Sequence, residues 1–212
     1  MFAGTEYLKI FTALLVIVNP IGALPIFVTL TSHQSERERR RTAVVSAVST
    51  GVVLIVACLL GDSLLQFFGI SVASFRVGGG ILILLMAIAM FHAQPSASKQ
   101  TPEEAAEAGE KADVAVVPLA IPLLSGPGAI STVIIYAHQM PDWKHGALLV
   151  ALCPLIAFIV WLTLRLAVPI GNALGRTGIN IVTRLMGLIL AAIAIEVIAS
   201  GVAVLLPGLV GR

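Results

Sequence analysis

Charged residues are scarce in this sequence. Asp, Glu, Lys and Arg make up 11% of its 212 residues, against about 25% in a typical soluble domain. A soluble fold of this length needs more charge to cover its surface. Apolar residues make up 58% of the chain, and the mean hydropathy is +1.02. The composition therefore excludes an ordinary soluble domain and favours a lipid bilayer as the surroundings.

Aromatic residues and cysteines are few as well. Aromatics make up 6% of the chain and no basic patch interleaves with them, so nucleic acid is not an expected partner. The two cysteines, Cys58 and Cys153, lie within apolar runs and lack metal-ligand spacing, so we interpret them as packing residues. The histidines show no pair at ligand spacing either. We expect neither a metal nor another cofactor.

Six apolar runs reach the roughly 20 residues that a membrane-spanning helix needs. They are Leu8–Leu30, Thr42–Phe68, Ser71–His92, Val114–His138, His145–Val168 and Ile179–Leu206. The second run is interrupted near Gly61-Asp62, and Pro207-Gly208 closes the sixth. The sequence therefore predicts an all-α membrane protein with six transmembrane helices.

Six spans place both termini on the same side of the membrane, and the basic residues indicate which side that is. The connections after the first, third and fifth spans, with the adjoining helix ends, hold Arg37, Arg39, Arg40, Arg41, Lys99, Lys111, Arg165, Arg176 and Arg184. The opposite side holds Lys9, Arg76, Lys144 and Arg212. Lys and Arg are enriched in cytoplasmic connections. We therefore predict that both termini lie outside, in the periplasm, and interpret Glu36 to Arg41 as a cytoplasmic headgroup anchor.

The two halves of the chain resemble each other at a shift of about 108 residues. Arg76 then aligns with Arg184, and Gly79 aligns with Gly187. Each half holds three spans, an odd number, so the second copy must insert upside down, as in many secondary transporters. We therefore divide the chain into a first three-helix repeat (residues 1–92), a cytoplasmic loop (93–113) and a second three-helix repeat (114–212).

The first and the fourth spans each contain a cluster of proline and glycine near the middle. The clusters are Asn19-Pro20-Ile21-Gly22 with Pro25, and Pro118, Pro122 and Ser125-Gly126-Pro127-Gly128. Proline removes an amide donor and glycine adds backbone freedom, so we predict broken first and fourth helices. A plain kink explains either cluster alone, and the matched pair favours a functional break. Freed amides suit a carboxylate and freed carbonyls suit an ammonium group, as in a zwitterionic amino acid.

These breaks define the candidate site at the bilayer midplane. The candidate substrate-binding residues are Asn19, Pro20, Gly22, Ser125, Gly126, Pro127, Gly128, Ser131 and Thr132. Glu196, an acid inside the sixth span, is the candidate for proton coupling, and a place near the outer end of that span is its alternative reading. Arg76 and Arg184 are interpreted as interfacial residues or, alternatively, as a gate or inter-helix pair. We expect no catalytic residues.

Four blocks of sequence occur in a recognisable order. They are Asn19-Pro20-Ile21-Gly22-Ala23-Leu24-Pro25-Ile26-Phe27, Phe75-Arg76-Val77-Gly78-Gly79-Gly80-Ile81, the run from Pro118 to Ile130, and Gly178-Ile179-Asn180 through Arg184-Leu185-Met186-Gly187. Together they resemble the MarC family of bacterial membrane proteins, some of which are described as small neutral amino-acid transporters. The resemblance implies an inner-membrane transporter of alanine, glycine, serine or threonine, whose partners are the lipid bilayer and the amino acid.

Other classes of function compete with a secondary transporter. A non-transporting membrane scaffold or regulatory protein fits the same spans, as does a transporter of another small solute. An enzyme is disfavoured, because no serine-histidine, paired aspartate or His-Glu-x-x-His arrangement falls within a span. A nucleotide-binding loop of the Gly-x-x-x-x-Gly-Lys type is also missing. The sequence leaves open the transport direction, the coupling ion and whether the chain forms a homo-oligomer.

Overall fold

The computed structural model describes residues 4–92, 115–139 and 143–209, and all regular structure in these ranges is helical. The first half contains α1 (Gly4–Val18), α2 (Leu24–Leu30), α3 (Glu36–Phe67) and α4 (Val72–Phe91). The second half contains η1 (Ala115–Leu124), α6 (Pro127–His138), α7 (Trp143–Arg165), α8 (Ala167–Leu205) and η2 (Pro207–Leu209). The all-α fold class is confirmed. The expected cytoplasmic loop, residues 93–113, lies outside the described residues.

The helices follow the predicted apolar runs closely. Four of them are long and apolar enough to cross a membrane: α3, α4, α7 and the part of α8 from Thr177 to Leu205. The predicted first span is divided between α1 and α2, and the predicted fourth span between η1 and α6. The chain therefore leaves regular helix at both predicted proline and glycine clusters.

The predicted interruption near Gly61-Asp62 is wrong, because α3 runs without a break from Glu36 to Phe67. Gly61 is buried, and a Cβ placed on it would overlap the side chain of Ile134 on α6. Its small size therefore serves a close approach between two helices, a use of glycine that is frequent between membrane helices. From the sequence alone, a single glycine in a long apolar run does not reveal whether it interrupts the helix or lets another helix pack closely.

The start of α3 is fixed by a reciprocal cap. The amide of Glu38 donates to the Ser35 hydroxyl, and the Ser35 amide donates to the Glu38 carboxylate at 2.7 Å. The side-chain and backbone hydrogen bonds from Ser35 hold the pKa of Glu38 below its ordinary value of 4.5. The cap satisfies amides that have no partner within the helix, so the arginines that follow are presented from an ordered helix end.

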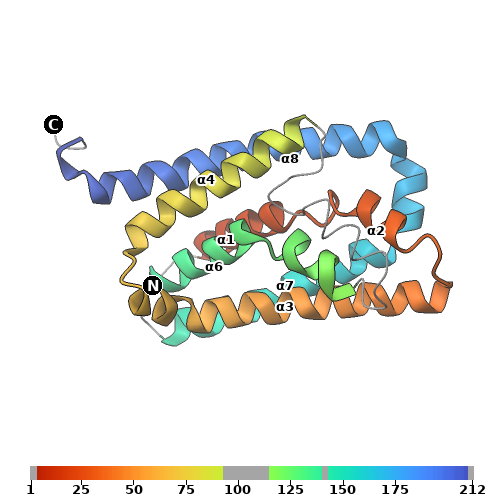
Figure 1. Ribbon diagram of the computed structural model, residues 1–212, viewed down its shortest axis with the longest axis horizontal. Helices are drawn as coiled ribbons and strands as arrows, with labels where there is room; N and C mark the ends of the chain where they lie inside the picture. The colour runs from red at the N-terminus through yellow and green to blue at the C-terminus, as the bar shows by residue number, and fades with distance from the viewer. Residues whose placement is uncertain (1–3, 93–114, 140–142, 210–212) are drawn as a thin grey trace.

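The helices form three layers (Figure 1). One outer layer pairs α4 with α8, which is the most extensive contact between elements in the described residues, and the other pairs α3 with α7. The central layer contains α1 with α2, and η1 with α6. Helix α6 packs on both α3 and α4. The two divided elements therefore lie between the two layers of long helices.

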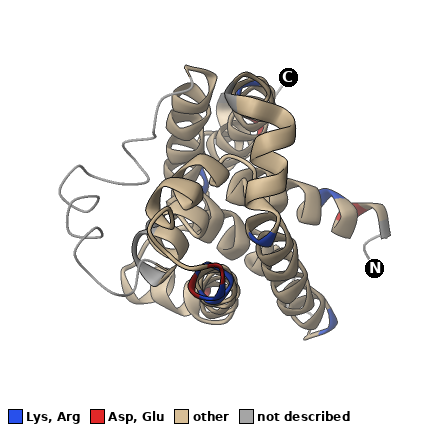
Figure 2. Ribbon diagram, turned by 90° about the vertical axis from the view of Figure 1, so that its right-hand side faces the viewer, with Lys and Arg blue, Asp and Glu red and all other residues tan. Residues whose placement is uncertain are grey.

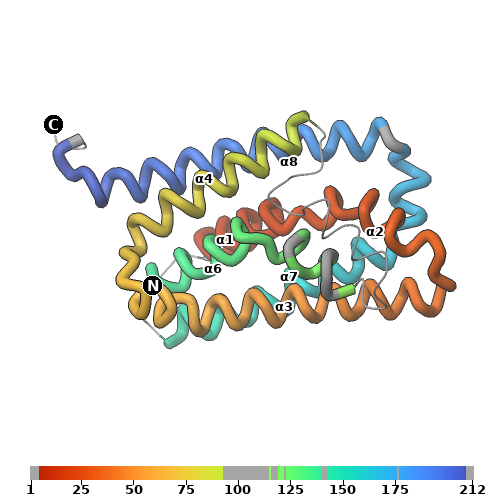
Figure 3. Tube along the Cα trace, in the orientation of Figure 1, coloured from red at the N-terminus to blue at the C-terminus, as the bar shows by residue number. Residues whose placement is uncertain are grey.

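Glycines set the distance between α4 and α8. A Cβ on Gly80 would lie 3.2 Å from the Ala194 carbonyl oxygen, and one on Gly187 would lie 3.0 Å from that of Ala87. A Cβ on Gly201 would lie 2.8 Å from the Ala73 carbonyl oxygen. Three glycines therefore let the two backbones approach at three heights along the contact. Helix α8 also changes direction at Gly175, whose φ of 61° lies in the left-handed region (Figure 3).

We predict that Gly80→Val lowers the free energy of unfolding by about 1–3 kcal/mol, the usual cost of overpacking. Gly78 provides a matched control, because a Cβ there meets nothing within 4 Å. Gly78→Val should leave the free energy of unfolding unchanged or raise it by under about 1 kcal/mol, because valine has a higher helix propensity than glycine. Thermal or SDS unfolding of the purified variants measures both values. Equal losses would contradict the packing role of Gly80.

Candidate functional site

The first break is organised by Asn19. This residue has a φ of 49° and is 5% exposed. Its Oδ1 accepts a hydrogen bond from the Gly22 amide at 3.1 Å, and its Nδ2 donates to the Met90 sulfur at 3.6 Å. Asparagine tolerates the left-handed conformation better than most residues. Asn19 therefore ends α1, turns the chain and ties the turn to α4 at one position.

Gly22 completes this turn. A Cβ at this position would overlap the Asn19 side-chain amide. Pro25 then occupies one of the first two positions of α2, where its missing amide costs no hydrogen bond. The sequence Asn19-Pro20-Ile21-Gly22 thus ends one helix and permits the next to begin.

The second break follows a wide helical turn. Both the amide and the hydroxyl of Ser125 donate to the Ala120 carbonyl oxygen, at 2.9 and 2.7 Å. This five-residue spacing is that of a π-helix, which is found in single turns and often at functional sites. Helix α6 then begins at Pro127, and its N-cap Gly126 offers no side-chain hydrogen bond. The amides at the start of α6 are therefore not capped by a side chain.

Most of the predicted polar residues are buried and bonded close by. Ser125, Ser131 and Thr132 are 1%, 4% and 3% exposed. The Thr132 hydroxyl donates to the Gly128 carbonyl oxygen at 2.8 Å, as Ser125 does to Ala120. Buried polar groups need such partners where water is excluded. The structure therefore shows a closed arrangement, with these two hydroxyls satisfied by their own helix.

Helix α4 connects the two breaks. Met90 contacts the Asn19 amide, and a Cβ on Gly128 would lie 3.2 Å from the Met86 sulfur and 3.4 Å from Ile17 of α1. Further along α4, a Cβ on Gly79 would lie 2.7 Å from the Ser131 Cβ. The structure thus brings residues of both breaks against one helix. Pro127 differs from its neighbours in being exposed.

The three predicted charged residues occupy different surroundings. Glu196 is exposed on α8, and Arg184 is exposed closer to the start of the same helix. Arg76 is half-buried on α4 beside Gly201, and its Nε is buried without a hydrogen-bond partner. Within the described residues neither arginine forms an ion pair.

Two histidines at the ends of predicted spans, His138 and His145, form hydrogen bonds that connect helices. The His145 Nε2 lies 2.9 Å from the Tyr136 carbonyl oxygen, and its Nδ1 lies 3.0 Å from the Tyr7 hydroxyl. A carbonyl only accepts, so Nε2 donates, and in the neutral ring Nδ1 accepts from Tyr7. His138 pairs with Asp62 at 2.6 Å. These bonds join α7 to α1 and α6, and α6 to α3.

The sequence patterns did not indicate a cavity between α2 and the bent part of α8. It has a volume of about 490 Å³ and polar side chains from Thr29, Asn172 and Asn180. Gly175, where α8 changes direction, is also part of its lining. The only sign of this cavity in the sequence is that its polar lining residues occur within apolar stretches. The cavity lies beside the half-helix that follows the first break.

The fold and these breaks define an integral membrane protein with divided helices at its centre. Comparison with known proteins gives its family: residues 4–206 match the MarC family integral membrane protein. The chain therefore belongs to the MarC family.

Similar proteins occur in bacteria and archaea. The chain is 41% identical to a UPF0056 membrane protein of Buchnera aphidicola over 209 residues, covering 99% of this chain and 97% of the relative. It is 38% identical to the UPF0056 membrane protein YhcE of Escherichia coli, covering 96% and 94%. A relative in Methanocaldococcus jannaschii, also a UPF0056 membrane protein, is 37% identical, covering 92% and 95%. No solved structure matches.

We predict that Gly22→Ala destabilises the protein by about 1–3 kcal/mol, because the new methyl displaces the Asn19 amide and leaves buried polar groups unpaired. Gly146→Ala adds the same methyl group in α7, where a Cβ meets nothing within 4 Å. That control should unfold at the wild-type temperature or slightly above it. A Gly22→Ala protein as stable as the control would show that the turn does not depend on Asn19.

Proposed function

We propose that this chain is a secondary transporter of small neutral amino acids, of the alanine, glycine, serine and threonine type, built from two inverted repeats of three spans. The observation that carries the proposal is the packing of two broken helices against each other at the centre of the bundle. Irregular backbone within a membrane must face protein or a water-filled cavity. In secondary transporters such broken helices surround the solute site.

The pairing of elements supports the two repeats. Under the proposed division, α3 corresponds to α7, α4 to α8, and the α1–α2 pair to η1–α6. The long helices pack on their own counterparts, α3 on α7 and α4 on α8, and the first divided element packs on the second through α1 and α6. The members of each pair also run in opposite directions along the bundle (Figure 1). Opposite direction is what an inverted repeat requires.

The glycine contacts support the same relation. Gly80 of α4 approaches Ala194 and Ile198 of α8, and Gly187 of α8 approaches Ala87 and Phe91 of α4. The two contacts therefore exchange roles between the helices, at two different heights along the bundle. The weak sequence similarity between the halves thus has a counterpart in packing.

The chemistry of the breaks suits a neutral zwitterion. The start of α6, with its uncapped amides and positive dipole end, suits a carboxylate. The carbonyls where α1 and η1 end suit an ammonium group. Neither break carries a charged side chain, so a solute without net charge leaves no unbalanced charge inside the membrane. In the closed arrangement, hydroxyls and amides already bonded within the protein occupy these positions, and the solute replaces those partners.

The choice of amino acids rests on the resemblance to the MarC family. The cavity beside α2 gives the solute a route toward the first break. We assign the solute contacts to the nine residues from Asn19 to Thr132 named above. Glu196 is assigned to proton coupling. Its place within the part of α8 that is apolar enough to cross a membrane supports this assignment.

Counterflow in proteoliposomes tests the proposal. Vesicles with purified protein and internal alanine should accumulate labelled alanine, serine, glycine or threonine. Gly126→Leu should reduce uptake by about tenfold or more, the factor that 1.4 kcal/mol of lost interaction gives. Gly146→Leu is the matched control and should retain uptake. Absence of counterflow with all four solutes would defeat the amino-acid assignment, and unchanged uptake by folded Gly126→Leu would show that the solute site does not depend on the second break.

Uptake into the same vesicles under a proton gradient tests the role of Glu196. In the wild type, an inward proton gradient should stimulate uptake. In Glu196→Gln this stimulation should be lost while counterflow between equal solutions remains, because exchange needs no net proton movement. Stimulation that survives the substitution would remove Glu196 from the coupling path.

We also propose that the protein resides in the bacterial inner membrane with both termini in the periplasm. The two chain ends lie at one end of the bundle, and the basic start of α3 lies at the opposite end (Figures 1 and 2). Cytoplasmic ends carry the excess of Lys and Arg.

Fused reporters test this orientation. Alkaline phosphatase at the C-terminus should be active, and green fluorescent protein at the same position should be dark after export in an unfolded form. The same reporters fused after truncation at residue 98 should give the opposite pattern. A bright fluorescent C-terminal fusion with inactive phosphatase would reverse the proposed orientation.

A further inference from the structure

The basic end of the bundle contains a pocket between the start of α3 and the end of α7. Its volume is about 440 Å³, and its charged lining consists of Arg39, Arg40, Arg165 and Glu36. Figure 2 looks onto this end and shows the charged residues gathered at the start of α3. Three guanidinium groups thus share a small volume with one carboxylate.

Only one of the three guanidinium groups is neutralised by that carboxylate. Arg40 forms an ion pair with Glu36. Arg39 is half-buried, and its Nε is buried without a hydrogen-bond partner. Arg165 lies over the Trp161 ring, 5.3 Å from its centroid. Among the described residues neither Arg39 nor Arg165 forms an ion pair. The pocket is therefore positively charged and has unused donors.

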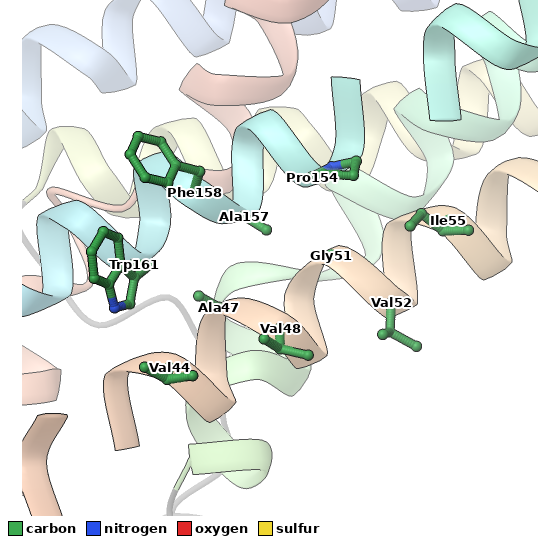
Figure 4. Close-up of a pocket in the computed structure, with 10 residues that line it drawn as sticks. All are labelled: Val44, Ala47, Val48, Gly51, Val52, Ile55, Pro154, Ala157, Phe158 and Trp161. Atoms are coloured by element: carbon green, nitrogen blue, oxygen red, sulfur yellow. The ribbon is translucent and has the colours of Figure 1, made fainter. Parts of the chain in front are cut away.

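An apolar groove of about 520 Å³ lies between the same two helices (Figure 4). Gly51 of α3 and Ala157 of α7 form its floor, since a Cβ on Gly51 would lie 3.0 Å from the Ala157 Cβ. Val44 and Val48 line it from α3, and Trp161 lines it from α7. Every residue that lines this groove is apolar or aromatic.

The pocket and the groove lie on one continuous stripe. Arg40, Val44 and Val48 follow one another at intervals of four residues along α3, and such residues share a helix face. On α7, Arg165 and Trp161 are also four residues apart, and Phe158 follows three residues before Trp161. The groove therefore leads away from the arginines along the length of the bundle.

We propose that this seam binds an anionic phospholipid, such as phosphatidylglycerol or cardiolipin. Its phosphate lies between Arg39 and Arg165, and one acyl chain lies in the groove. Arginine presents paired donors that match the oxygens of a phosphate. Basic pockets between membrane helices bind anionic headgroups in this way. A zwitterionic lipid brings its own cation toward the positively charged pocket, so it binds more weakly.

The chain offers a direct measurement. Trp143 and Trp161 are its two tryptophans, and Trp143 is 76% exposed outside the groove. In a Trp143→Phe protein, fluorescence quenching by lipids with brominated acyl chains reports on Trp161 alone. Brominated phosphatidylglycerol, competing with ordinary phosphatidylcholine, should quench about tenfold more effectively than the reverse combination, a factor of the size that charge-assisted hydrogen bonds give. Equal quenching by the two lipids would overturn the proposal without any further variant.

Paired variants then locate the site. Arg39→Gln with Arg165→Gln should remove most of the preference. Arg37→Gln with Arg41→Gln removes the same charge from exposed positions of the same basic cluster that do not line the pocket, and it should retain the preference. An equal loss in both pairs would assign the effect to the general surface charge. Soluble glycerol phosphate should not compete, and effective competition by it would show that the acyl groove is not part of the site.

Discussion

The need to satisfy backbone hydrogen bonds away from water determines how this molecule is arranged. A straight helix bonds its own amides and carbonyls, so α3, α4 and α7 can present side chains to lipid along much of their length. The chain around Asn19 and Ser125 cannot do this, because proline and glycine interrupt the regular pattern. It must instead be covered by protein, and the structure places both divided elements in the central layer. The outer helices thus serve as the surroundings that irregular backbone requires.

Small residues make this enclosure possible. Gly80, Gly187 and Gly201 bring α4 and α8 together, while Gly61 lets α3 approach α6. Between membrane helices there is no gain from removing apolar surface from water, so contact depends on close packing and on shape. Gly79 shows how specific the requirement is. Its two neighbours face different surroundings, with Gly78 open and Gly80 against α8. One run of three glycines therefore serves separate contacts.

Much of the fold could be predicted because its signals are local. Long apolar runs give the helices, and proline with glycine gives the breaks, so α4 was predicted to within one residue at each end. The prediction of an interruption at Gly61 was wrong because Ile134, the residue that Gly61 packs against, is distant in the sequence. The α2–α8 cavity was missed for a similar reason: a bend at Gly175 and two asparagines acquire their meaning only when α2 packs beside them. At the candidate site, sequence indicated the residues but not their partners, as with Asn19 and Met90.

Each outer layer contains one long helix from each half of the chain, and this has a consequence for biosynthesis. When α3 and α4 emerge from the ribosome, α7 and α8 have not yet been made. The first half must then wait in the bilayer with its glycine-lined faces covered by lipid and its Asn19 turn only partly enclosed. The last helix to be synthesised completes the layer that α4 began. Assembly is therefore a late event, and a chain halted before α8 presents quality-control proteases with an open interior.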